Sequence, residues 1–205
     1  MPATLTDQAT RERLIAAAER LFAERGVGAV SLRAVMQEAQ ANVASVHYHF
    51  GSKPALVEAV VRTRMGQVSD GRAAMLADLT DPEPRALAEA FIQPVLDVIA
   101  DGGGDWVRVI GQLLASNDAA LSPISESFLA RNARFVELLG RLDPPPSPAA
   151  VGFRLSQAMT LTLNVLGNLD RTRSLLSGDN PGWSDEEVVR QLLDVVTAVL
   201  AGPRD

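Results

Sequence analysis

The chain has 205 residues, of which 47% are hydrophobic and only 4% aromatic, so Leu, Val and Ala must fill most of any core. This length fits one domain or two small ones. There is no cysteine, which excludes a disulfide framework, a thiolate zinc site and a cysteine nucleophile. No apolar run reaches the roughly 20 residues of a membrane span, and the N-terminus lacks a basic-then-apolar signal segment. We therefore expect a soluble cytoplasmic protein that binds no membrane.

The net charge of -6 argues at first against a nucleic-acid partner. The charge is unevenly distributed, however, with +1 on residues 1–53 and -7 on residues 54–205. The acidic side chains thus lie mostly outside the first quarter of the chain. A weakly basic head of this kind predicts modest non-specific affinity for DNA and a dependence on base contacts and dimerisation.

A first helix is predicted from about Asp7 to Arg25, after a loose tail at residues 1–6. Its apolar residues recur at helical spacing, and Gly26 is expected to end it. This stripe comprises Leu14, Ala17, Ala18, Leu21 and Phe22. We expect the helix to pack across the next two helices.

Two short helices and a tight turn are predicted between Ser31 and Lys53, in the stretch SLRAVMQEAQANVASVHYHFGSK. Ser31 is placed to cap the first of them and Asn42 the second. Gly51 is expected to end the second helix, and Ser52 to cap the long helix that follows. Two apolar-faced helices joined by so short a turn resemble a DNA-binding helix-turn-helix.

The second helix of this pair has the character of one that enters a DNA major groove, because it is small and weakly charged and its N-terminal side chains can touch base edges. Val46 and Phe50 are expected to anchor it. Hydroxyl, imidazole and amine groups nearby can hold phosphates, helped by the helix N-termini. The predicted DNA-binding residues are Ser31, Arg33, Asn42, Val43, Ser45, His47, Tyr48 and Lys53.

The same stretch resembles the DNA-binding head of the TetR family of bacterial regulators. That family carries a pattern close to A-G-V-S-x-G-x-L-Y-x-H-F-x-S-K-x-x-L, and residues 39–56 read AQANVASVHYHFGSKPAL. Gln40 stands where the turn glycine is usual, so a left-handed conformation is expected of a residue with a side chain. His47 replaces the usual phosphate-binding Tyr, with Tyr48 beside it, and Pro54 falls in a first helical turn, which tolerates it.

Two other interpretations of the stretch stay open at this point. It can be an ordinary helical hairpin within a core. His47 and His49 can also be considered as metal ligands, but residues two apart on a helix point to different sides and chelate poorly. We expect no metal and no cofactor.

The remainder of the chain is predicted to be helical, without repeats and without strand-like alternation. A long helix from Ser52 to about Leu79 links the head to the rest, either as a lever or as a plain scaffold. Pro94 is expected to kink the next helix, and Gly66 and Gly71 permit a bend in the long one. The other helices are predicted at about 84–100, 105–116, 123–141, 149–169 and 184–201, the last opening with a capping box of Ser184 and Glu187.

The last two of these helices carry wide apolar arcs, so each must be buried on more than one side. Two such helices from each of two chains can form a four-helix interface, as the resemblance to the TetR family also implies; a monomer that covers these faces itself is the alternative. The predicted interface residues are Leu155, Met159, Thr162, Leu166, Val189, Leu193, Val196 and Leu200. A symmetric dimer would place two recognition helices about 34 Å apart, which matches a palindromic site.

The resemblance further implies a small-molecule pocket between the central helices of the C-terminal domain. Candidate lining residues are the few large or polar side chains on otherwise apolar helices, although Phe and Met at this spacing are more often core. These candidates are Phe91, Trp106, Gln112, Phe128, Met159 and Asn164. The resemblance therefore also implies a small-molecule effector as a partner.

We therefore expect an all-α protein of about nine helices, with a three-helix helix-turn-helix DNA-binding domain at residues 1–53 and a ligand-binding and dimerisation domain at residues 54–205. The expected function is a DNA-binding transcriptional regulator, a ligand-responsive repressor that binds a palindromic operator on double-stranded DNA as a homodimer. A helical adaptor or ligand-binding protein without a DNA role is the alternative. No constellation of catalytic residues supports an enzyme.

Overall fold

The computed structural model describes residues 5–42, 48–81, 83–116, 128–176 and 182–203. Within these ranges all regular structure is helical and there is no strand, as predicted. The helices are α1 (Leu5–Arg25), α2 (Leu32–Glu38), α4 (Lys53–Leu76), α5 (Pro84–Val98), the π-type turn η1 (Ile99–Gly103), α6 (Gly104–Ser116), α8 (Ala133–Leu139), α9 (Pro148–Gly167), α10 (Leu169–Leu176) and α11 (Asp185–Ala201).

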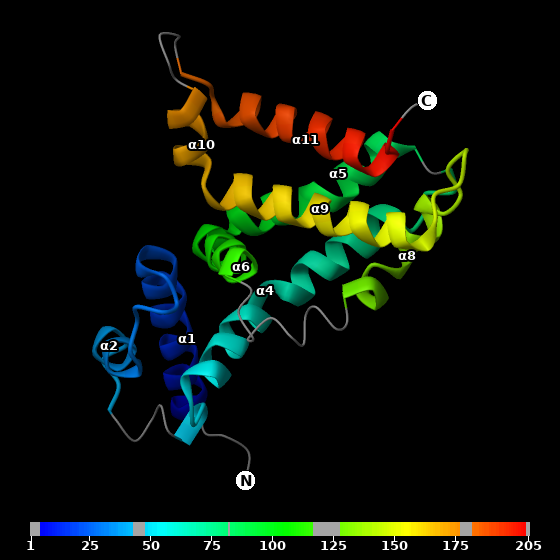
Figure 1. Cartoon of the computed structure of the whole chain (residues 1–205). Helices are drawn as coiled ribbons and strands as arrows, with labels where there is room; N and C mark the ends of the chain where they lie inside the picture. The colour runs from blue at the N-terminus through cyan, green and yellow to red at the C-terminus, as the bar shows by residue number, and fades with distance from the viewer. Residues whose placement is uncertain (1–4, 43–47, 82, 117–127, 177–181, 204–205) are drawn as a thin grey trace.

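The helices form a small head and a larger body joined by α4 (Figure 1). Helix α1 lies between α2 and the start of α4, and α4 then runs diagonally into the body. Helices α9 and α11 lie side by side at the far edge, with α10 between their ends and α5 packed against α11. Helix α6 lies between α1 and α9 and contacts both, so head and body share one continuous core.

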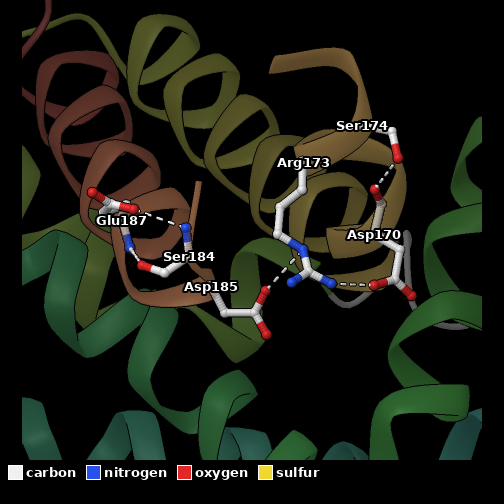
Figure 2. Close-up of polar contacts among 6 residues, drawn as sticks. All are labelled: Asp170, Arg173, Ser174, Ser184, Asp185 and Glu187. Carbon is white, nitrogen blue, oxygen red and sulfur yellow. Dashed lines mark hydrogen bonds and ion pairs between the residues drawn. The ribbon is translucent and has the colours of Figure 1, made fainter. Parts of the chain in front are cut away.

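Four of the helices begin directly after a serine whose side chain caps the helix N-terminus. The hydroxyls of Ser31, Ser52 and Ser147 each accept a hydrogen bond from the backbone N–H three residues later, which supplies one of the bonds missing at a helix start. At α11, Ser184 and Glu187 form a capping box with distances of 3.2 and 2.8 Å (Figure 2). The caps predicted at residues 31, 52 and 184 are therefore confirmed.

Helices α4 and α5 cross where glycine meets proline. A Cβ atom built on Gly71 would lie 2.9 Å from Cβ of Pro94, so this glycine allows the close approach of two helices. Helix α5 runs through the buried Pro94. Non-helical backbone angles occur later, at Asp101 and Gly102, where the chain turns from α5 into α6.

Two predicted helices differ from the structure. The helix expected at 149–169 ends at Gly167, and a separate helix, α10, follows without a single buried residue. An apolar sequence pattern does not predict a helix without buried residues. Arg173 of α10 forms an ion pair of 3.2 Å with Asp185 at the start of α11 (Figure 2). The helix expected at 123–141 lies partly outside the described residues, and its described part is broken at Asn132 (φ -106°, ψ 23°).

The two glycines of α4 provide a matched test of the α4–α5 crossing. We expect Gly71→Ala to lower the free energy of unfolding by about 1–3 kcal/mol, because Pro94 is rigid and cannot yield to the new methyl group. Gly66 is exposed with nothing within 4 Å of its Cβ position, so Gly66→Ala should raise the free energy of unfolding by up to ~1 kcal/mol. Urea denaturation measures both. Equal stabilisation by the two variants would show that the crossing is not tight.

Candidate nucleic-acid interface and ligand cavity

The turn after α2 has the geometry that a helix-turn-helix requires. Gln40 adopts φ +50°, so the left-handed conformation predicted for this residue is confirmed. The N–H of Ala41 donates to the carbonyl of Met36 across the turn, at 3.0 Å. Gly51, also with positive φ, precedes the Ser52 cap of α4. The second predicted helix of the pair, residues 42–50, is called the recognition segment. Local backbone conformation thus defines the turns on both sides of it.

The predicted DNA contacts Val43, Ser45 and His47 lie outside the described residues, as does the expected anchor Val46. Of the other predicted contacts, Ser31, Arg33 and Asn42 are exposed. Tyr48 is 76% exposed, so its ring and hydroxyl are accessible to a partner. Lys53 is half-buried, and its Nζ donates to the carbonyl of Gly28 at 3.3 Å, which holds its amine near the loop between α1 and α2.

His49 connects the end of the recognition segment to α1. Its side chain is only 7% exposed, and its Nε2 lies 3.3 Å from a carboxylate oxygen of Asp7. The next residue, Phe50, packs against the core, as predicted, with the guanidinium of Arg11 over its ring at 5.4 Å. This role of His49 was not predicted from the sequence, although the TetR family pattern has a His at this position.

Helix α6 is a second connection between the head and the body, in addition to α4. The side-chain amide of Gln112 donates to the carbonyl of Ala23 on α1 at 3.2 Å. The indole N–H of Trp106 is shared between the carbonyls of Val60 and Val61 on α4, at 3.0 and 3.1 Å. Burial raises the pKa of the nearby Glu19 carboxyl on α1. Helix α6 therefore has polar contacts with two helices that position the head.

A cavity of about 80 Å³ lies between α4, α5, α6, α9 and the short helical segment at 128–131. Its lining is mainly apolar and includes two arginines, Arg72 and Arg131. The lining residues are Met65, Val68, Ser69, Arg72, Val95, Trp106, Ile110, Phe128, Arg131, Asn132, Met159 and Leu163. Within the described residues, no group of His, Asp or Glu side chains is arranged to hold a metal ion.

Three of the six predicted pocket residues line this cavity: Trp106, Phe128 and Met159. The other three lie elsewhere. Phe91 is fully buried and stacks edge-on against Phe135, Gln112 faces α1, and Asn164 is exposed on α9. The hypothesis that a buried amide marks the pocket is therefore wrong for Asn164, because apolar arcs that extend nearly round a helix do not tell which side is covered.

The apolar side chains that α9 and α11 expose are not the predicted ones, because they lie on a different face of each helix. Leu155, Thr162, Leu166, Val196 and Leu200 are buried within the chain itself. Met159, Val189 and Leu193 are half-buried. The exposed apolar face carries other residues, with Phe153 66% and Val195 48% exposed. Two open apolar hollows along this face are lined by residues of α9 to α11, including Phe153, Leu161, Val165, Val195 and Val199.

None of the helices in the described ranges is long and apolar enough to cross a membrane. The fold and the exposed turn instead define a helix-turn-helix protein with an appended helical body.

Comparison with known proteins identifies its family. Residues 14–60 match the family described as "Bacterial regulatory proteins, tetR family", and residues 89–199 match "Tetracyclin repressor-like, C-terminal domain". The second match alone covers more than half of the chain, so this chain belongs to the TetR family of DNA-binding transcriptional regulators, which are not enzymes.

Relatives agree with this assignment. The chain is 30% identical over 88 residues to the HTH-type transcriptional regulator BetI of Rhizobium meliloti (strain 1021), a match that covers 43% of each protein. It shares its fold with the fatty acid degradation regulator FadR from Bacillus halodurans (TM-score 0.66, 17% identity, 95% of this chain and 96% of that one). The fold of Mycobacterium smegmatis AmtR is also similar (TM-score 0.61, 19% identity, 100% and 90%).

The left-handed residue in the turn is open to direct measurement. A side chain in this conformation costs roughly 1–2 kcal/mol, whereas glycine loses more entropy on folding, so Gln40→Gly should stabilise the protein by up to ~1 kcal/mol. Gln37 is an exposed residue inside α2, and Gln37→Gly should cost about 1 kcal/mol. Thermal and urea melts report both. Destabilisation by both variants alike would contradict the strain argument.

Proposed function

We propose that the chain acts as a homodimeric, ligand-responsive repressor that binds a palindromic operator, with residues 1–53 as the DNA-binding domain and the rest as the ligand-binding and dimerisation domain. The observation that carries this proposal is the exposed Tyr48 at the end of a helix-turn-helix whose turn and flanking caps are complete. Because its DNA partner lies there, the regulator works in the bacterial cytoplasm.

In this proposal the DNA surface combines base readout with phosphate contacts. Arg33 is exposed on α2, and the exposed Asn42 and Tyr48 flank residues 43–47 in the chain; Val43, Ser45 and His47 belong to the DNA surface by the family pattern. Lys53 is the first residue of α4, and its ammonium group, which gives one hydrogen bond to the carbonyl of Gly28, has two further N–H groups for a phosphate at this helix N-terminus. Ser31 is the N-cap of α2 and so lies at a second helix N-terminus.

Dimerisation in this proposal uses the exposed apolar face of α9 and α11. An apolar strip runs along α9 and α11, which lie side by side, and it consists of Phe153, Leu161, Val195 and Val199. An exposed apolar strip of this kind is costly to leave in water. Pairing with the same strip of a second copy gives a closed two-fold interface. Three of the interface residues predicted from the sequence, Leu155, Val196 and Leu200, instead belong to the core within the chain, which packs α9 and α11 against their neighbours beneath this strip.

Ligand response would run through α6. A ligand in the cavity touches Trp106, whose indole N–H bonds α4, and α6 also bonds α1 through Gln112. A ligand that binds one arrangement of α6 more tightly than another shifts the population between them and changes the spacing of the two heads. The required differential affinity is a few kcal/mol at most, typical of allosteric coupling at about 1–3 kcal/mol.

Removal of the Lys53 amine tests the phosphate contact. We expect Lys53→Gln to weaken binding to an operator selected from random DNA, and to reduce the slope of log affinity against log salt by about 1. Arg62→Gln is the control, because Arg62 is exposed on the same helix two turns further on and pairs with Glu58. Gel shifts at several salt concentrations measure the slope. An unchanged slope, or a selected site without palindromic symmetry, would contradict the assignment.

A charge on the exposed strip tests the dimer. Phe153→Glu should convert the dimer to a monomer in light-scattering chromatography and abolish operator binding, because two carboxylates would be buried opposite each other. Met75→Glu is the matched control, since Met75 is 44% exposed on α4, away from this face. If the Phe153→Glu protein stays dimeric and folded, the interface lies elsewhere.

A further inference from the structure

The cavity contains a guanidinium that has no carboxylate partner. Arg72 lies on α4 and lines the cavity, and its hydrogen bonds and ring contact within the described residues go to Phe91 and Asn132 and not to an acidic side chain. Burial lowers the pKa of Arg72 to about 10, because the charged form is disfavoured away from water. The group nevertheless remains protonated at neutral pH. An arginine held in this way is costly to the fold unless an anion joins it.

Three neighbours hold the Arg72 guanidinium in place. Its carbon atom lies 3.8 Å from the centre of the Phe91 ring, in a cation–π contact. Its Nε and Nη2 donate to the carbonyl of Phe91 at 3.3 and 3.1 Å, and its Nη1 donates to the side-chain oxygen of Asn132 at 3.4 Å. Each Nη carries two hydrogens, so one N–H on each has no assigned partner. The helix break at Asn132 brings that amide to the arginine.

The rest of the lining matches an apolar molecule. The cavity that Arg72 lines is also lined by Met65, Ile110, Phe128 and Met159, and no Asp or Glu is among the lining residues that the structure describes. At about 80 Å³ the cavity is much smaller than the ~300 Å³ or more typical of drug-sized sites. Its occupant must therefore be small, with one polar end.

We propose that the effector of this regulator is a small organic carboxylate with an apolar body, and that Arg72 receives its carboxylate group. The inference rests on the ligand response proposed above and names its chemistry. A carboxylate can accept two parallel hydrogen bonds from a guanidinium, which suits the two remaining N–H groups. The planar carboxylate therefore fits the guanidinium of Arg72 in both charge and geometry.

Tryptophan fluorescence provides a direct assay for this site. The chain has two tryptophans, and only Trp106 lines the cavity, so a Trp183→Phe background makes the emission report on the site. The probes are benzoate, phenylacetate, hexanoate and octanoate, each compared with its neutral amide. We expect at least one acid to bind saturably at millimolar concentration or below, at least tenfold more tightly than its amide.

The variants separate charge from shape. Arg72→Gln should remove the preference for the acid, Arg72→Lys should retain part of it, and Arg62→Gln on the same helix should leave it unchanged. The comparison of acid and amide on the unsubstituted Arg72 keeps the test valid even if an Arg72 variant fails to fold. Saturation by no acid, equal affinity for acid and amide, or an Arg72→Gln protein that still prefers the acid would each overturn the proposal.

Operator binding in the presence of each probe distinguishes this inference from the proposed function. Acids that bind through Arg72 without changing operator affinity would uphold the carboxylate site and refute the ligand response. A neutral probe that releases the operator while no acid binds would uphold the ligand response and overturn the carboxylate site.

Discussion

The tight packing of α6 between the head and the body is the constraint on which the rest of the structure depends. Glycines allow its contact with α9: a Cβ atom on Gly111 would lie 3.1 Å from the carbonyl oxygen of Leu163, and one on Gly167 would lie 3.1 Å from Cα of Arg108. On the other side, Gln112 and Trp106 bond the backbones of α1 and α4. Because packed helices have little room to yield, a displacement of α6 must be passed to its neighbours.

This arrangement explains how a cavity in the body can influence a head that it does not touch. Trp106 connects the cavity to α4, because its ring lines the cavity and its indole N–H donates to a backbone carbonyl of α4. Arg72 lies on the same α4 that begins at the Ser52 cap beside the recognition segment. A ligand held between α4 and α6 therefore contacts the two helices that connect to the head, which gives it a physical means of favouring one head position over another.

Motifs with local causes were predictable from the sequence. The hydroxyl caps of α2, α4 and α11 and the left-handed Gln40 depend only on a few neighbouring residues, and all of them are present. The family pattern around residues 39–56 likewise records a turn geometry that the chain adopts locally. Helix α10 was not predicted in this way, because five of its eight residues are polar and none of them is fully buried.

The sequence by itself determined the helical class of the protein, its helix-turn-helix and most of its helix starts, because backbone conformation and capping are decided over a few residues. Only the tertiary structure decided which face of α9 and α11 is covered and which side chains meet at the cavity. On a helix that is apolar nearly all round, Leu155 and Phe153 look equivalent, yet one is fully buried and the other 66% exposed. Likewise, Arg72, Phe91 and Asn132 come from three segments far apart in the chain, and no local pattern records that they meet.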